Sequence, residues 1–512
     1  MVAGTPSLER ARADGPPLVL GGYAALAEGA WMGAAQASDV LEPARLAHGR
    51  EGMPRPRRLR LAGLLTRELS ITEATVVLMA SFFFSALLGA VRQILFNAQF
   101  GAGQEANAYY AAFRLPDALF SLIAGGALSS AMIPVLLSAV REEGEDAGWR
   151  LTNLVLTGLL AVFAVVVLAG EVLAPAFVHG LLAPGFAAGT SQLTVTLTRL
   201  MLLQPLILAV GSVATAVLNS RSQFVLTALS VASHNVGLLA GIGAAIAYPR
   251  LGIYGPTLGV VAGALLQVLI LLPGLLGRHF RYRPAWNPHD NRLRELVRLL
   301  IPNGLAVGVG YAGFIVDTSF ASKAGEVAGL AAIQNAWMMV GLPVALLGQA
   351  VGQSAFPRLA AHAAALEWSR MRRTLGQALG AGVVLAIPAL VGLIILGRPV
   401  IHLLFEHGKF GAGAGSLTYA VLVPYAVALP AYVATEVLTR GLIALRDTRT
   451  PLLTNSAQLA GRALIIAALL GTAGVLAIPI AFAVAASVET VVLGTVLMLK
   501  LQWRLATAAS GL

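Results

Sequence analysis

Long runs of apolar residues recur along most of the chain and constrain its fold more than any other feature. A helix needs roughly 20 predominantly apolar residues to cross a hydrocarbon core about 30 Å thick. Only 12% of the 512 residues are charged, against about a quarter in soluble domains. The sequence therefore predicts an all-α polytopic membrane protein with about twelve transmembrane helices. We place them at 71–98, 106–138, 152–176, 194–218, 223–248, 253–276, 297–321, 327–356, 374–397, 416–440, 450–470 and 474–499.

Basic residues in the connections predict how these helices are oriented. When alternate connections are compared, one side of the membrane carries eighteen Lys and Arg residues, and the other carries only Arg250, Lys323, Arg398 and Lys409. Cytoplasmic loops of membrane proteins carry the excess of Lys and Arg. We therefore expect both termini in the cytoplasm. The net charge of +11 fits loops that face anionic lipid, so we expect no nucleic-acid partner.

The longest basic connection, from Arg278 to Arg298, divides the predicted helices into six and six. We expect a basic, mostly disordered tail at 1–68, an N-lobe at 69–280 and a C-lobe at 281–512. Two pseudo-symmetric lobes of six helices would have the same orientation in the membrane, an arrangement found in transporters that bind substrate between two bundles.

Weak similarities between the halves favour this division. Residues Ser130–Pro134 end the second predicted helix, and Ser354–Pro357 end the eighth. Apolar helices of low complexity also resemble one another by chance, so both explanations stay open.

Motifs of enzyme chemistry are missing from the sequence. No G-x-x-x-x-G-K-[ST] loop occurs, which disfavours ATP as the energy source, and no H-E-x-x-H motif occurs. The chain has no Cys, and its eight His residues are scattered singly. We therefore expect a transporter rather than an enzyme, with no metal site and no cofactor beyond a coupling Na⁺ or H⁺.

Ionisable residues within the predicted helices are functional candidates, because each costs about 2.5 to 3.5 kcal/mol near the bilayer centre. Arg114 and Asp117 lie three residues apart on one helical face, and Ser121 continues that face. The face either lines a hydrated cleft or holds Arg114 and Asp117 as a packed ion pair.

The C-terminal half holds further buried ionisable groups. Asp317 has no cationic neighbour in sequence, which makes it a candidate cation or proton site together with Asn455. The signs of Glu436, Arg462 and Glu489 predict a buried ion-pair cluster among the last three helices.

Proline and glycine mark two places where helices are expected to bend. Pro116 with Gly125 and Gly126 lies in the second predicted helix, and Gly341 with Pro343 lies in the eighth. Bending at matched places in the two halves is what alternating access requires. Close helix packing explains the glycines equally well.

Short segments between about residues 80 and 460 carry a family resemblance. They are Leu88–Arg92, Phe100–Gly103, Ala112–Asp117, Gly126–Ala131, Ala183–Phe186, Leu218–Asn219 and Phe405–Phe410. Together they resemble the MurJ/MviN family, the lipid II flippases of the MOP exporter superfamily. The resemblance implies a MOP-type fold whose two lobes enclose a cationic cavity. It also implies alternating access, driven by an ion gradient or by membrane potential.

The resemblance implies a substrate and a site as well. The substrate would be a polyprenyl-diphosphate-linked peptidoglycan precursor, moved across the cytoplasmic membrane of a bacterium by a monomer in contact with membrane lipids. Arg92 and Arg114 would contact its anionic headgroup, Asp117 would orient Arg114, and Ser121 and Asn335 would line the same cavity.

Several positions depart from the family pattern. Arginines, acids and a basic pair that are usual in the family are replaced here by Ala86, Gln93, Asn107, Phe120–Ser121, Gly125 and Met338. The family generally has fourteen helices, against twelve predicted here. Two alternatives therefore stay open: an exporter of another lipid-linked oligosaccharide or an amphipathic cation, and a non-transporting scaffold for cell-envelope enzymes.

Overall fold

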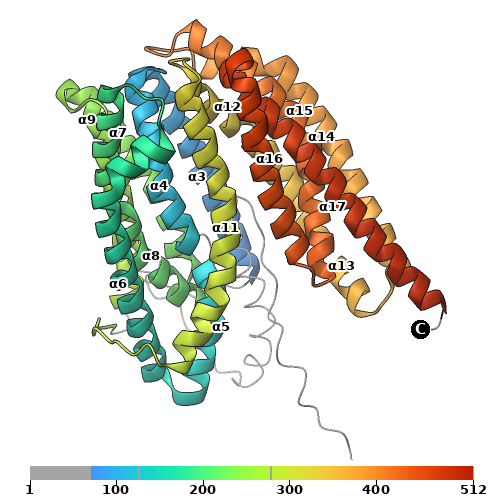
Figure 1. Cartoon of the computed structure of the whole chain (residues 1–512). Helices are drawn as coiled ribbons and strands as arrows, with labels where there is room; N and C mark the ends of the chain where they lie inside the picture. The colour runs from blue at the N-terminus through green and yellow to red at the C-terminus, as the bar shows by residue number, and fades with distance from the viewer. Residues whose placement is uncertain (1–70, 125–126, 277–279, 511–512) are drawn as a thin grey trace, which may run out of the picture.

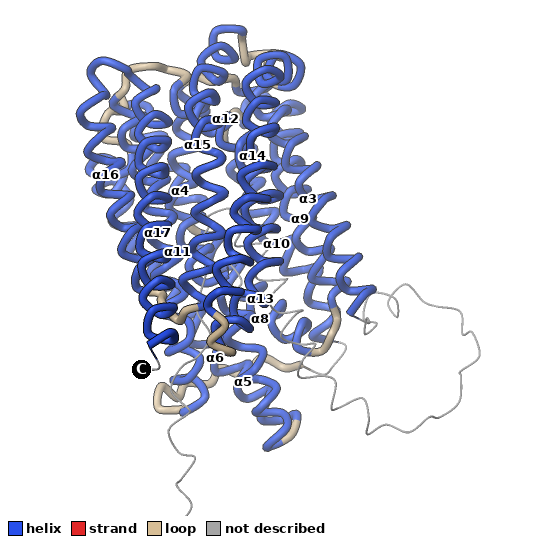
Figure 2. The backbone as a smooth tube through the Cα atoms, turned by 90° about the vertical axis from the view of Figure 1, so that its right-hand side faces the viewer, coloured by secondary structure: helices blue, strands red, loops and turns tan. Residues whose placement is uncertain are grey.

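The computed structural model describes residues 71–124, 127–276 and 280–510, so the predicted tail at 1–68 lies outside it. Within the described ranges the chain forms helices joined by short connections, with no strand (Figure 2). The all-α prediction is confirmed. Each predicted window falls on one helix or on consecutive helices.

The first half of the chain forms eight α-helices, two of which are followed by short turns of another helix type. They are α3 (Ile71–Phe100), α4 (Gln104–Ala124), α5 (Ala127–Glu143), α6 (Glu145–Phe177) with the π-helical turn η1 (Val178–Leu182), α7 (Ala188–Met201), α8 (Leu203–Ser220), α9 (Phe224–Ala247) with the 3₁₀ turn η2 (Pro249–Leu251), and α10 (Tyr254–Leu276).

The second half forms seven α-helices and two short turns of another helix type. It comprises α11 (Asn291–Lys323), α12 (Gly329–Pro343), the π-helical turn η3 (Val344–Gln349), α13 (Ala350–Ala364), α14 (Trp368–Leu404), α15 (Ala412–Ala444), α16 (Arg449–Ala473), the 3₁₀ turn η4 (Gly474–Leu476) and α17 (Ala477–Ser510).

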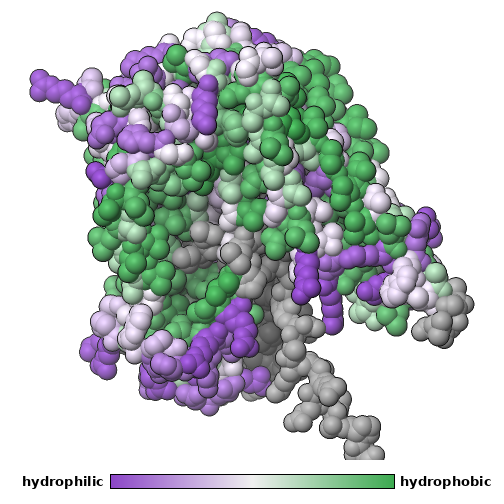
Figure 3. Space-filling model, viewed as in Figure 1, coloured by the Kyte–Doolittle hydropathy of each residue, from purple (hydrophilic) through white to green (hydrophobic). Residues whose placement is uncertain are grey.

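Nine helices or joined runs of helices in the described part of the chain are long and apolar enough to cross a membrane. The last of these runs joins α16 to α17, whereas α4, α5 and α11 are not among the nine. The count of twelve spans therefore stays a prediction. Large apolar side chains face outward: Phe83, Val172 and Leu464 are 74%, 76% and 73% exposed. Figure 3 shows an apolar surface on the flanks and polar residues gathered at the two ends, as lipid tails require.

Helices α9 and α10 pack at backbone contact through small residues. A Cβ added to Gly237 would lie 2.2 Å from the Cα of Gly263, and one added to Gly241 would lie 2.4 Å from the carbonyl oxygen of Gly255. Such close approach increases dispersion contact where the hydrophobic effect does not hold helices together. Helix α3 packs against α9 of this pair.

The helices form two groups with α11 between them (Figure 1). Helices α3 to α10 lie on one side, and α12 to α17 lie on the other. The groups approach each other at the top of Figure 1, near the start of α12, and diverge toward the bottom. Because α11 contacts α4 and α5 as well as α16, the lobe boundary at residue 280 stays a prediction.

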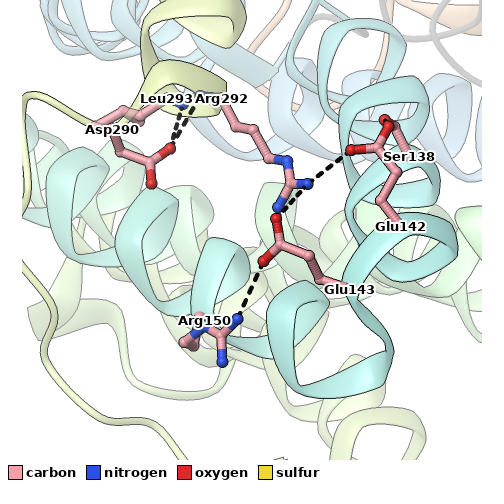
Figure 4. A network of polar contacts seen from close by, with 7 residues as sticks. All are labelled: Ser138, Glu142, Glu143, Arg150, Asp290, Arg292 and Leu293. Atoms are coloured by element: carbon pink, nitrogen blue, oxygen red, sulfur yellow. Dashed lines mark hydrogen bonds and ion pairs between the residues drawn. The ribbon is translucent and has the colours of Figure 1, made fainter.

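A charged network fixes the lower end of α11 to the first group (Figure 4). Arg292 donates to Glu142 and also pairs with Glu143, at 3.0 and 2.8 Å, and Arg150 pairs with Glu143 at 3.3 Å. Asp290 caps α11 by accepting two backbone N–H groups of the first turn, each at 3.0 Å. Helix α11 is therefore anchored to α5 at this end.

Candidate functional site

A cavity of about 90 Å³ lies where α4 faces the second group of helices. Most of its wall comes from α11, α12, α15, α16 and α17. Its lining comprises Arg114, Val309, Gly310, Gly313, Phe314, Asp317, Ile333, Gln334, Trp337, Tyr425, Tyr432, Asn455, Gln458, Leu459, Arg462, Phe482 and Glu489. The lining thus combines two arginines and two acids with an aromatic wall.

Arg114 reaches into this cavity from α4. Its Nε donates to the Thr318 hydroxyl at 3.1 Å, and one terminal nitrogen donates to Gln334 Oε1 at 3.0 Å. Its guanidinium carbon lies 5.3 Å from the ring centroid of Phe314, a cation–π distance. Arg114 is therefore held by residues of α11 and α12.

Asp117 and Ser121 follow Arg114 on the same face of α4, but they contact another residue. Ser121 donates to the Tyr311 hydroxyl at 2.6 Å, and Tyr311 in turn hydrogen-bonds to the Asp117 carboxylate. The predicted ion pair between Asp117 and Arg114 is not formed, since the hydrogen bonds of Arg114 go to α11 and α12. The two residues interact through their charges without touching.

Arg92 lies on α3 and does not belong to the cavity lining. It donates to Asn235 Oδ1 on α9 at 3.3 Å, and Asn235 donates to the Ser85 hydroxyl at 3.0 Å. Arg92 is half-buried and still affects Asp117 electrostatically. The expectation that Arg92 and Arg114 line one cavity is therefore not met in this conformation.

Asp317, which has no cationic neighbour in sequence, is paired with a residue from a distant helix. Arg462 on α16 forms an ion pair with Asp317 on α11, and both side chains are almost fully buried, at 8% and 5% exposed. The predicted cluster of Arg462 with Glu436 and Glu489 was right about a buried ion pair and wrong about its acid. Asn455 lies on the same helix as Arg462 and lines the cavity.

Asn335 is fully buried in a cluster of neutral polar side chains outside the cavity. Gln93 and Asn97 of α3 each donate to Asn335 Oδ1 at 2.9 Å, and Gln93 also contacts the Tyr110 hydroxyl at 2.6 Å. We call Gln93, Asn97, Tyr110 and Asn335 the amide cluster. It ties α3 and α4 to α12, so Asn335 joins the two groups of helices in this state.

Three backbone contacts close the same end of the molecule. Asn107 donates to the Val327 carbonyl at 2.6 Å, the Gly185 N–H donates to Ser322 Oγ at 3.0 Å, and the Lys409 N–H donates to the Ala98 carbonyl at 2.8 Å. The first two contacts join the first group to the end of α11 and to the connection that follows it, and the third joins the first group to the second.

Gly408 makes the last of these contacts sterically feasible. It has φ +58°, and an added Cβ would lie 2.3 Å from the Ala98 oxygen. No other residue type fits that backbone position without strain.

Of the two predicted bending places, the one at Gly341 and Pro343 coincides with a break in regular helix. Gly125 and Gly126 lie between α4 and α5, outside the described residues, and Pro116 lies inside α4. Gly341 and Pro343 end α12, and the π-helical turn η3 follows directly.

The sequence did not single out the residues of the aromatic wall, and it did not reveal the role of Arg462. Trp337 packs edge-on against Tyr425 and Phe482, with ring centroids 5.5 and 5.4 Å apart. The spacing of Asn455, Gln458 and Arg462 along one face of α16 was a usable signal, because residues three, four and seven apart share a helical face.

Comparison with known proteins gives consistent matches over most of the chain. The family model described as "Lipid II flippase MurJ" matches residues 96–509. The lipid II flippase MurJ of Burkholderia cenocepacia is 31% identical over 376 residues, which are 72% of each chain. A probable lipid II flippase MurJ of Bdellovibrio bacteriovorus is 27% identical over 440 residues, which are 84% of this chain and 83% of the relative.

Two solved structures share the fold. A lipid II flippase MurJ in an inward closed conformation has TM-score 0.69 and 22% identity, covering 82% of this chain and 86% of its own. An inward-facing MATE family transporter of the MOP superfamily has TM-score 0.67 and 13% identity, covering 83% and 96%. These matches confirm the MOP-type fold, and the family match over residues 96–509 establishes that this chain belongs to the lipid II flippase MurJ family.

Proposed function

We propose that this chain moves lipid II across the cytoplasmic membrane of a bacterium by alternating access. The observation that carries the proposal is the family match over residues 96–509, together with 31% identity to a relative described as a lipid II flippase. Apolar helices long enough to cross a bilayer support a multi-pass membrane protein, and the lipid II flippase relatives support the inner membrane as its location. We further propose that it acts as a transporter without enzymatic activity, and as a monomer.

The excess of basic residues in alternate connections supports an orientation with both termini in the cytoplasm. The closed end, where Lys409 contacts Ala98, then faces outward, and the diverging end faces the cytoplasm. Lobes at 69–280 and 281–512 would pivot about α11. This conformation would receive substrate from the cytoplasmic side.

The headgroup would be held by arginines. A diphosphate cannot cross hydrocarbon bare, and guanidinium groups bind its oxygens in pairs. Arg114 already lies in the cavity, and Arg92 would join it when the helices rearrange. Ser121 and Asn335 are engaged between the two groups here and would reach the headgroup only after the groups separate.

A cation gradient or membrane potential would drive the cycle, with Na⁺ or H⁺ as the coupling ion. Asp317, together with Asn455, is our candidate site for that ion. Since Arg462 now neutralises Asp317, the ion would have to displace it. Pro116, Gly125, Gly126, Gly341 and Pro343 would supply the bending.

Complementation tests the proposal. A strain depleted of its own lipid II flippase should regain growth when it expresses this chain, and Arg92→Ala should reduce the rescue. Failure of the wild-type chain at normal membrane levels would contradict the assignment of lipid II as the substrate. Full rescue by Arg92→Ala would remove Arg92 from the mechanism.

A further inference from the structure

Arg462 is a second arginine in the cavity, and it comes from the other group of helices than Arg114. Both side chains are nearly buried, at 7% and 6% exposed. The Asp317 carboxylate interacts electrostatically with both of them. A buried guanidinium costs free energy near the bilayer centre unless it is paired. A function that uses the positive charge would explain why both arginines face one small cavity.

The pairing of Arg462 leaves hydrogen-bonding capacity unused. Its Nε has no hydrogen-bond partner, and neither does Oδ1 of Asp317, although both atoms are buried. A buried donor without a partner is destabilising. The Asp317 carboxylate is therefore an incomplete match for the five donors of Arg462. An anion with more oxygens and more charge would satisfy them better.

The surroundings of Arg462 suit the anionic part of a ligand. Gly313 leaves room for the guanidinium, since an added Cβ would lie 3.4 Å from its terminal nitrogen. Asn455 and Gln458 bring amide groups to the same wall.

Aromatic side chains form one wall of this site beside Arg462. The Arg462 guanidinium carbon lies 4.9 Å from the ring centroid of Phe482, and Phe482 packs against Trp337 and Tyr425. Charge–charge attraction is stronger where water is excluded. An anion that enters the cavity would therefore be attracted strongly to both arginines.

We propose that Arg114 and Arg462 together bind the diphosphate of the lipid-linked substrate, and that the Asp317 carboxylate occupies Arg462 until the diphosphate replaces it. This inference rests on the proposed function and deepens it. It supplies a second cation from α16, in a chain where other cavity arginines usual in the family are absent. Asp317 acts here as an internal anion in competition with the ligand.

The proposal predicts opposite effects for the two members of the ion pair. Arg462→Gln should weaken diphosphate binding about tenfold or more, because one charge-assisted interaction is lost. Asp317→Asn should strengthen binding several-fold, because Arg462 is released from its competitor. A purely structural pair would behave differently, since loss of either partner would damage the cavity and weaken binding in both variants.

Binding to the purified full-length chain in detergent is the test, with farnesyl diphosphate as the probe and farnesol as its uncharged control. Calorimetry gives the affinity, and thermal unfolding shows whether each variant is folded. Arg462→Lys and the double variant Asp317→Asn with Arg462→Gln complete the set. Arg462→Lys should bind with intermediate affinity, and the double variant should bind as weakly as Arg462→Gln. Binding is measured instead of transport because Asp317 is also the candidate coupling-ion site.

Each result of these measurements either supports or contradicts the inference. Equal affinity of the wild type and a folded Arg462→Gln variant would overturn the inference, as would weaker binding by a folded Asp317→Asn variant or recovery of binding in the double variant. Inorganic pyrophosphate that binds more tightly than farnesyl diphosphate would overturn the assignment to a lipid-linked ligand. A wild-type chain that binds the probe yet fails to complement contradicts the proposed function alone. One that neither binds nor complements contradicts both.

Discussion

At the residue scale, the sequence predicts which charges are buried better than it predicts their partners. Arg114 and Asp117 were found because their spacing puts them on one face of a helix. Arg462 and Asp317 are 145 residues apart and meet only because α11 packs against α16. No local pattern encodes that contact. The predicted pairing of Arg114 with Asp117 was wrong for the same reason. The partners of Arg114, Thr318 and Gln334, come from the other half of the chain.

Arg114→Gln should lower the rate of lipid II translocation in reconstituted vesicles at least about tenfold, because a charge-assisted interaction is worth roughly 1.5 to 3 kcal/mol. Fluorescent lipid II that becomes accessible in the outer leaflet gives the rate. Arg150→Gln is the matched control, because Arg150 is an exposed arginine of the network at the lower end. A normal rate in Arg114→Gln would remove this arginine from the substrate path.

The loop that contains Gly408 should loosen in acid. Hydrogen bonds from Arg398 and His402 hold the pKa of Glu406 below its usual value. Because the folded pKa is depressed, this stabilisation is complete above about pH 4.3, the usual glutamate value. It is lost as the pH falls through the folded value.

Amide hydrogen exchange at Lys409, whose N–H donates to Ala98, should therefore accelerate below about pH 4 beyond the intrinsic change. Glu406→Gln should remove the extra acceleration. The same pH dependence in that variant would show that another group controls the loop.

At the element scale, apolar windows located the helices, and small residues decided how closely they pack. The break after Pro343 was expected from Gly341 and Pro343, but its form as a π-helical turn was not, because that depends on how η3 packs against α15. The contact between α9 and α10 could not be predicted from the sequence either. Glycines on a helix permit close packing but do not specify which helix is the partner.

Gly237→Leu should destabilise the protein, because its Cβ would lie 2.2 Å from Gly263 Cα and the helices must move apart. Overpacking costs about 1 to 3 kcal/mol or more. Thermal unfolding in detergent measures the loss. Gly243→Leu on the same helix is the control, since an added Cβ there meets nothing within 4 Å. Equal stability of the two variants would argue against backbone contact between α9 and α10.

At the scale of the whole molecule, two groups of helices meet at one end and diverge at the other (Figure 1). The halves of the sequence suggested two bundles, and the MurJ family resemblance suggested a cavity between them. Which end is closed could not be predicted, because closure depends on contacts such as Lys409 with Ala98 that join distant segments. In the proposed orientation, the diverging end faces the cytoplasm.

A cross-link at the closed end should stop transport. The chain has no Cys, so Ala98→Cys with Lys409→Cys introduces one defined pair. Oxidation should abolish translocation in vesicles, and a reducing agent should restore it. Glu145→Cys with Arg221→Cys joins two helices of the same group at an existing ion pair and should leave transport active. Full activity of the oxidised Ala98–Lys409 pair would mean that this end does not open.

The amide cluster carries no formal charge. Separation of Gln93 and Asn97 from Asn335 would strand no ion in hydrocarbon and would move no charge through the electric field. Membrane potential acts on charges at about 2.3 kcal/mol per unit charge per 100 mV. It therefore does not directly change the free energy of separating this uncharged cluster. The strength of the amide cluster at the closed end should then be the same in energised and de-energised cells. Voltage would instead act through the arginines and the anionic cargo they hold.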